Sequence, residues 1–208
     1  MCSKYGRTYA VPAAIMQRKA VRKSHRMHRP TDNLRADHEL ATLGVRVLAA
    51  LSEWVAAGEE FPAKDCAAAL SLLREGVRGV HMRKEDEVMA PAVAMLADED
   101  AAAIVGELLR LREEIVALTH SLVLFWEPMG DLTTSESTGF AETVHALVAR
   151  LRRRQQLEED SLFPACDANV PGDDQLQWLE QFAQLEAERS SRAVWKRRID
   201  VLAARWLN

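Results

Sequence analysis

Two stretches of the sequence, HMRKEDEVMAP at residues 81–91 and RRQQLEEDSLFP at residues 153–164, share one spacing and indicate an internal repeat. In the first stretch, Glu85 and His81 lie six and ten residues before the final proline. In the second, Glu158 lies six residues before the proline and an arginine lies ten residues before it. The repeat therefore keeps the glutamate, at an offset of 73 residues, and replaces the histidine by arginine.

The spacing of His81 and Glu85 places both side chains on one side of a helix. Residues four apart lie about 40° apart around the helix axis and one turn above each other, so both can face one metal ion. Apolar residues of the same segment share this face, and the same count from Glu158 puts Arg154 on the apolar face of the second copy. Arg154 is therefore expected in the interior, where arginine is rare unless it is paired.

Composition favours one helical domain. The chain has 208 residues, of which 48% are apolar, and only nine glycines and seven prolines. This content is enough for a sizeable core and favours helices over sheets. The three widely spaced cysteines indicate reduced thiols. No apolar run reaches the roughly 20 residues of a membrane span. Pro12 interrupts the short N-terminal apolar stretch, so we do not expect a signal peptide. A soluble cytoplasmic protein is expected.

Turn residues and apolar spacing predict five helical segments. An all-α fold is expected, with the first four segments in an up-down-up-down four-helix bundle. The fifth, amphipathic segment is expected to cover the side of the bundle or to form a homodimer contact. The first four predicted segments span about residues 32–57, 63–90, 98–126 and 137–161, and the fifth follows residue 174.

The N-terminal 30 residues form a basic arm. They contain eight lysines and arginines and no acidic residue, so the net charge of −4 leaves −12 on residues 31–208. We expect the arm to lie on the acidic body of its own chain or of a dimer partner, with nucleic acid or anionic lipid as alternatives. The chain is thus divided into the arm (1–30), the bundle (31–165) and a C-terminal helical extension (166–208).

The motif LRADHEL at residues 34–40, followed by HMRKEDEVMAP, resembles the hemerythrin/HHE cation-binding family. The repeat of that family is a histidine on one helix and H-x-x-x-E on the next, and the resemblance covers roughly residues 32–165. It implies a bundle that binds non-heme iron, in the hemerythrin pattern two irons bridged by two acids. The family includes oxygen carriers, iron or oxygen sensors and nitrosative-stress repair proteins.

The resemblance implies metal ligands residue by residue. The first repeat and the second acid supply four of them: His38, His81, Glu85 and Glu158. The second repeat lacks two histidines. One is replaced by Arg154, and the other by Arg112, at an offset of 74 from His38. Glu114, at an offset of 76, is kept as an alternative ligand.

We hypothesise that the two arginines replace the charge of a second metal ion. Arginine stays protonated and has no lone pair to offer a metal, but it can pair with carboxylates. The remaining nitrogen and oxygen ligands suit one ion, with iron favoured over Mn or Zn. The alternative is a metal-free bundle that acts as a regulatory or interaction scaffold. No nucleophile–base pair or cofactor motif supports an enzyme.

His120 is expected on the surface, and the ExxH spacing at 142–145 is treated as chance.

Overall fold

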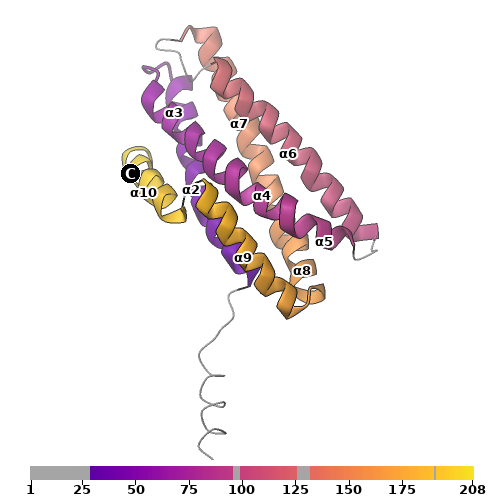
Figure 1. Ribbon diagram of the computed structural model, residues 1–208. Helices are drawn as coiled ribbons and strands as arrows, with labels where there is room; N and C mark the ends of the chain where they lie inside the picture. The colour runs from indigo at the N-terminus through magenta and orange to yellow at the C-terminus, as the bar shows by residue number, and fades with distance from the viewer. Residues whose placement is uncertain (1–28, 96–98, 126–131, 190) are drawn as a thin grey trace, which may run out of the picture.

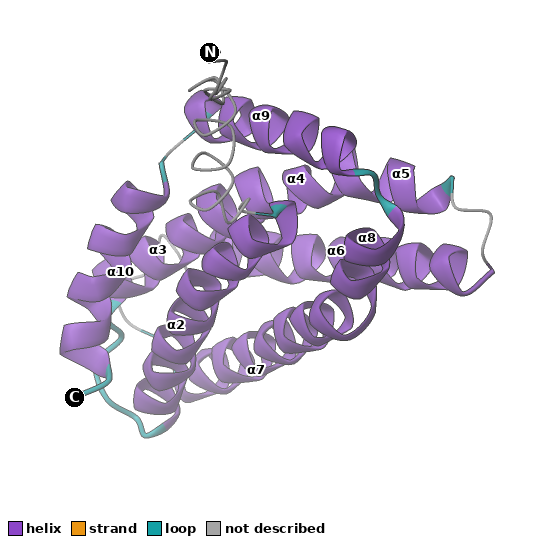
Figure 2. Ribbon diagram, turned by 90° about the horizontal axis from the view of Figure 1, so that it is seen from below, coloured by secondary structure: helices purple, strands orange, loops and turns teal. Residues whose placement is uncertain are grey.

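The computed structural model describes residues 29–95, 99–125, 132–189 and 191–208, and in these residues the ordered structure is helical without strands (Figures 1 and 2). Residues 1–28 of the basic arm lie outside the described residues. The docking that we expect of the arm therefore stays a prediction. None of the described helices is long and apolar enough to cross a membrane.

The four long helices of the bundle and two further helices follow each other along the chain. The first helix is α2 (Pro30–Ala56). The second is continuous through α3 (Ala63–Leu72), η1 (Leu73–His81), α4 (Met82–Lys84), η2 (Glu85–Met89) and α5 (Ala90–Ala94). The third is α6 (Glu99–Phe125). The fourth comprises α7 (Thr134–Leu157), η3 (Glu158–Leu162) and α8 (Phe163–Asn169). The chain ends with α9 (Gly172–Glu188) and α10 (Arg192–Trp206).

The packing confirms an all-α, up-down-up-down bundle. Helix α2 packs against α3 and α7, and α6 packs against α5 and α7, so the four long helices enclose one interior (Figure 1). The core of this interior consists of fully buried aliphatic and aromatic side chains, among them Leu48, Leu51, Leu70, Leu122, Phe140 and Leu147. The amphipathic spacing of each helix accounts for this arrangement, because one apolar stripe per helix is removed from water.

Helices α2 and α7 begin earlier than the sequence indicated. Pro30 is at the first helical position of α2, where its missing N–H costs nothing, and Asp32 accepts a hydrogen bond from the backbone N–H of Arg29 at 3.1 Å. Helix α7 begins after Thr133, whose backbone N–H donates to Glu136 at 2.8 Å. Both starts use the acidic residue of the first turn to satisfy a free backbone donor.

The prolines of the two repeats do not end their helices, contrary to our expectation. Each repeat contains a π-helical turn that begins at its glutamate, η2 at Glu85 and η3 at Glu158. In η2 the backbone N–H of Ala90 donates to the carbonyl of Glu85, and in η3 that of Phe163 donates to Glu158. The proline is the second residue after each of these wider turns, and the helix continues through it. Short π turns of this kind are frequent at functional sites.

The C-terminal extension forms two helices rather than the single helix that we expected. Helix α9 ends at Glu188, and α10 begins at Arg192 after Ser191, which adopts an extended conformation. Helix α9 packs on α2 and α4, and α10 packs on α2 and α3 (Figure 2). The buried Trp195, Ile199 and Leu202 provide the apolar face of α10, so this helix covers the side of its own bundle.

Candidate metal centre

Four buried side chains from three of the four long helices converge in the bundle interior. His38 projects from α2, His81 and Glu85 from the second helix, and Glu158 from the fourth. Each offers one nitrogen or oxygen atom, and these atoms all lie within 4.8 Å of one another. All four residues are at most 4% exposed. The structure therefore brings together the four residues that both repeats contribute to the candidate site.

The imidazole Nε2 atoms of both histidines face the two glutamates. Nε2 of His38 lies 2.8 Å from Oε2 of Glu158, and Nε2 of His81 lies 3.5 Å from the same oxygen. Nε2 of His81 is also 3.6 Å from Oε1 of Glu85. This Glu85 oxygen is buried and has no hydrogen-bond partner among the described residues. A buried carboxylate oxygen without a hydrogen-bond donor is costly, so a cation or a proton bound at this atom would stabilise it.

The other nitrogen of each histidine faces a second carboxylate. Nδ1 of His38 lies 2.8 Å from Oε1 of Glu159, and Nδ1 of His81 lies 3.7 Å from Oδ2 of Asp37. Carboxylates behind ligating histidines commonly orient the ring and leave Nε2 for the metal. We did not single out Asp37 or Glu159 in the sequence, although each directly neighbours a candidate ligand in the chain.

Arg154 lies in the interior, as its helical position predicted. It is 2% exposed, and its Nε lies 2.6 Å from Oε1 of Glu158. Its Nη2 lies 2.5 Å from Oε2 of Glu85, and its Nη1 donates to the backbone carbonyl of Leu108 at 2.7 Å. One guanidinium thus pairs with the glutamates of both repeats at oxygens other than those that face the histidines.

The structure does not bring Arg112 or Glu114 to the cluster. Arg112 is 45% exposed at its side chain and pairs with Asp86 at 2.8 Å. The carboxylate of Glu114 forms ion pairs with Arg110 and Arg150 instead. The reason is helical register, because an offset of 73 residues from His38 leads to Leu111, which is 1% exposed. A shift of one residue turns a side chain by about 100° around the helix.

Burial and mutual charge alter the acidity of the cluster. Burial alone would lower the pKa of His81, but the surrounding negative charges of Glu85, Asp37 and Glu158 raise it to about 10. Burial and the negative charge of Glu158 raise the pKa of Glu85. Burial opposes the ionisation of Glu158, yet the charge of Arg154 and hydrogen bonds from the histidines lower its pKa. The cluster therefore attracts positive charge, which a proton or a metal ion can supply.

A small cavity adjoins the cluster. Its volume is about 20 Å³, and its lining includes His38, His81, Arg154 and Glu158 together with apolar side chains. A cavity of this size has room for about one water-sized molecule.

The remaining histidines of the described chain lie elsewhere. His120 is exposed, as expected. The imidazole of His145 lies 3.4 Å from Ser52 Oγ, and His145 does not belong to the cluster of candidate ligands.

Bundle proteins build metal sites in their core from inward-facing histidines and carboxylates, so this His/Glu cluster could hold a metal ion. Comparison with protein families agrees, because the profile described as Hemerythrin HHE cation binding domain matches residues 23–166. The chain belongs to this family. Comparison with curated proteins and with solved structures gave no match.

Proposed function

We propose that the protein binds one divalent transition-metal ion through His38, His81, Glu85 and Glu158. Two imidazole nitrogens and two carboxylates form a ligand set that suits iron, manganese or zinc, and we favour non-heme iron. The observation that carries this proposal is the convergence of the four ligand atoms within 4.8 Å in a buried site. The unpartnered Glu85 oxygen supports it, since a cation would satisfy that atom.

Arg154 favours one ion over two. Its guanidinium pairs with an oxygen of Glu85 and an oxygen of Glu158, which a second bridged metal would otherwise use. Arginine remains protonated at any relevant pH and cannot ligate, so this side of the cluster is neutralised without a metal. Leu111, at the place of the second missing histidine, offers no ligand either.

The role that we propose is sensing, or the handling of metal, oxygen or nitrosative stress, rather than oxygen transport of the two-iron kind. Bound iron would supply a Lewis acid with one-electron redox chemistry. The residues of this chain would hold it, exclude bulk water through the apolar packing around them, and leave space for one small molecule in the adjoining cavity. Arg154 lines that cavity and can donate hydrogen bonds into it.

A second candidate function is a metal-free scaffold for a partner protein. The observation that favours it is the ion pair of Arg154 with both glutamates, which compensates part of the buried negative charge without any metal. In that case His81 would carry the remaining positive charge as an imidazolium, held by its neighbouring carboxylates.

Metal analysis distinguishes the two functions. We expect about one ion per chain in protein purified without added metal, or after metal-free protein is loaded anaerobically with Fe²⁺. His81→Ala should lose most of this metal, whereas the matched control His120→Ala, at an exposed position, should retain it. Absence of metal after loading with Fe²⁺, Mn²⁺ or Zn²⁺ would favour the scaffold. Two ions per chain would contradict the single-ion site.

A further inference from the structure

The carboxylate of Asp37, which faces His81, is held by two cations. Nζ of Lys84 donates to its Oδ2 at 2.7 Å, and Nε of Arg192 donates to its Oδ1 at 2.7 Å. Asp37 is 3% exposed and Lys84 is fully buried. Two positive groups thus contact a buried carboxylate directly, which offsets the cost of burying its charge.

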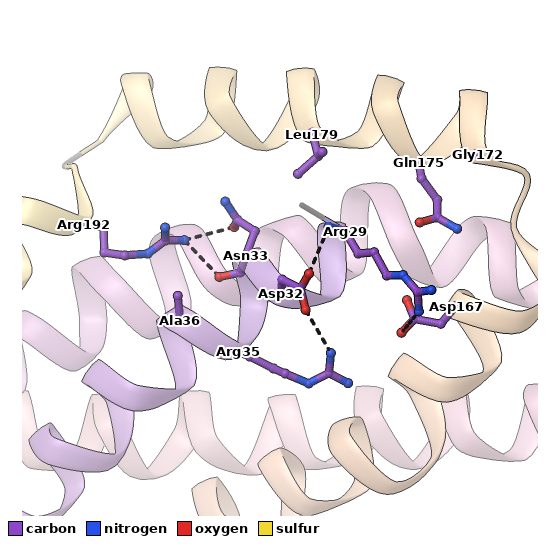
Figure 3. A pocket seen from close by; sticks show the side chains of 10 residues that line it. All are labelled: Arg29, Asp32, Asn33, Arg35, Ala36, Asp167, Gly172, Gln175, Leu179 and Arg192. Atoms are coloured by element: carbon purple, nitrogen blue, oxygen red, sulfur yellow. Dashed lines mark hydrogen bonds and ion pairs between the residues drawn. The ribbon is translucent and has the colours of Figure 1, made fainter. Parts of the chain in front are cut away.

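Further hydrogen bonds fix the two cations themselves. Lys84 also donates to Asn33 at 2.8 Å and to Glu186 at 2.7 Å, so all three of its N–H donors have acceptors. Arg192 also donates to the backbone carbonyl and the side-chain oxygen of Asn33, each at 3.0 Å (Figure 3). A hydrogen-bonded network of this kind, centred on the buried Asp37 and Lys84, favours one geometry. The position of Asp37 is thus set by four other residues.

Two of these four residues come from the C-terminal extension. Glu186 belongs to α9 and Arg192 to α10, and both lie beyond the residues 23–166 that the family profile covers. Their contacts with Asp37 on α2 and Lys84 on α4 link the extension to the helices that carry His38 and His81. Helices α9 and α10 therefore supply charged groups that contact Asp37 and Lys84, which directly precede the candidate ligands His38 and Glu85 in the chain.

We propose that Arg192 is a positioning residue of the metal centre, which holds Asp37 opposite Nδ1 of His81 and thereby makes metal affinity depend on the C-terminal helices. The proposal rests on the proposed metal binding. Asp37 lies 3.7 Å from Nδ1, and this nitrogen has no hydrogen-bond partner among the described residues. Asp37 is the carboxylate that faces this nitrogen, and a carboxylate behind a ligating histidine orients the ring and raises the ligand strength of the other ring nitrogen.

Arg192 has two opposite influences on a nearby metal ion. The proposal is therefore tested by whether removal of Arg192 weakens or strengthens metal binding. As a positive charge it repels a divalent cation, so its removal would strengthen binding. As the group that positions Asp37 it supports His81, so its removal would weaken binding. Arg192 lines an open hollow of about 1230 Å³ beside α2 and α9 (Figure 3) and is 30% exposed at its side chain, so a substitution leaves no sealed cavity.

The experiment uses the full-length chain, stripped of metal and titrated with Co²⁺, whose visible absorption reports both occupancy and ligand geometry. Arg192→Gln should raise the Kd for Co²⁺ about tenfold and alter the absorption bands, as expected for outer partners of ligating histidines. Arg192→Lys keeps the charge but lacks the planar fork, so it should also weaken binding. Arg198→Gln is the matched control, because it removes the same charge from α10 at a surface pair with Glu75.

Each outcome decides one question. If the parent protein binds no Co²⁺, the proposed metal binding fails and the role of Arg192 fails with it. If the parent binds and Arg192→Gln has an equal or lower Kd, the metal site stands but Arg192 acts only as a nearby charge. Equal weakening by Arg198→Gln would likewise overturn the positioning role. Circular dichroism of each metal-free variant checks that it is folded, and Arg192→Lys carries the test if the glutamine variant unfolds.

Discussion

Arg154 and Glu158 lie one turn apart on the same helix, with Nε of the arginine 2.6 Å from Oε1 of the glutamate. The guanidinium also reaches Glu85, the corresponding glutamate of the first repeat, at 2.5 Å. A permanently charged group thus occupies the position at which the repeat predicts a histidine. It neutralises buried carboxylate charge but cannot ligate a metal, and this contact distinguishes the second repeat chemically from the first.

We expect Arg154→Ala to destabilise the metal-free protein strongly. The substitution would leave Glu85 and Glu158 buried without their shared partner, and breaking a buried pair typically costs about 3–5 kcal/mol. Urea unfolding followed by circular dichroism measures the loss. Arg153→Ala is the control, because this neighbouring arginine is exposed and should change stability by less than about 0.5 kcal/mol. A loss below about 1 kcal/mol for Arg154→Ala would show that the pair does not stabilise the fold.

Arg154→His should increase metal capacity. An imidazole would then stand beside the two glutamates in place of the guanidinium, so the stoichiometry should rise from about one ion toward two when metal is in excess. Arg112→His is the matched control and should leave the stoichiometry unchanged, because Arg112 lies on the surface beside Asp86. Elemental analysis after anaerobic loading with Fe²⁺ measures both. An unchanged stoichiometry in Arg154→His would refute the idea that arginine excludes the second ion.

Two glycine-to-alanine substitutions should have opposite effects on stability. A Cβ added at Gly76 would lie 3.1 Å from the ring of Trp195, so Gly76→Ala should push α10 away from the bundle and cost about 1–3 kcal/mol. A Cβ at Gly106, inside α6, meets no atom within 4 Å. Gly106→Ala should therefore stabilise the protein by about 0.5–1 kcal/mol through helix propensity. Thermal unfolding of both variants tests this, and an equal shift in the same direction would argue against the close packing of Trp195.

The buried thiol of Cys66 should make stability fall at high pH. Burial raises the pKa of Cys66 to about 12, from an ordinary value near 9. Below pH 9 the thiol is protonated in both states. Above it only the unfolded chain loses the proton, so the free energy of unfolding falls by about 1.4 kcal/mol per pH unit until the folded pKa is reached. Cys66→Ala should reduce this slope by that amount between about pH 9 and about pH 11, measured by urea unfolding. Parallel pH profiles for parent and variant would contradict a buried neutral thiol.

The sequence alone determined the class of fold and indicated most of the candidate site. Apolar spacing predicted the four bundle helices, since a single buried stripe is all that such a bundle requires of each helix. The four-residue spacing of His81 and Glu85 determined that they share a face, and the helical count from Glu158 placed Arg154 in the interior. These features are local, because they follow from the geometry of one helix and need no knowledge of its neighbours.

The tertiary structure decided everything that depends on the relation between helices. The π turns at Glu85 and Glu158 carry the chain through prolines that we took for helix ends, because packing outweighs local propensity. The rotation of α6 put Leu111 inside and Arg112 outside, a difference of one residue that the imperfect repeat did not specify. We did not single out Asp37 or Lys84 in the sequence. Both are buried in the fold, where Glu186 of α9 and Arg192 of α10 complete the hydrogen-bond network around them and offset their charges.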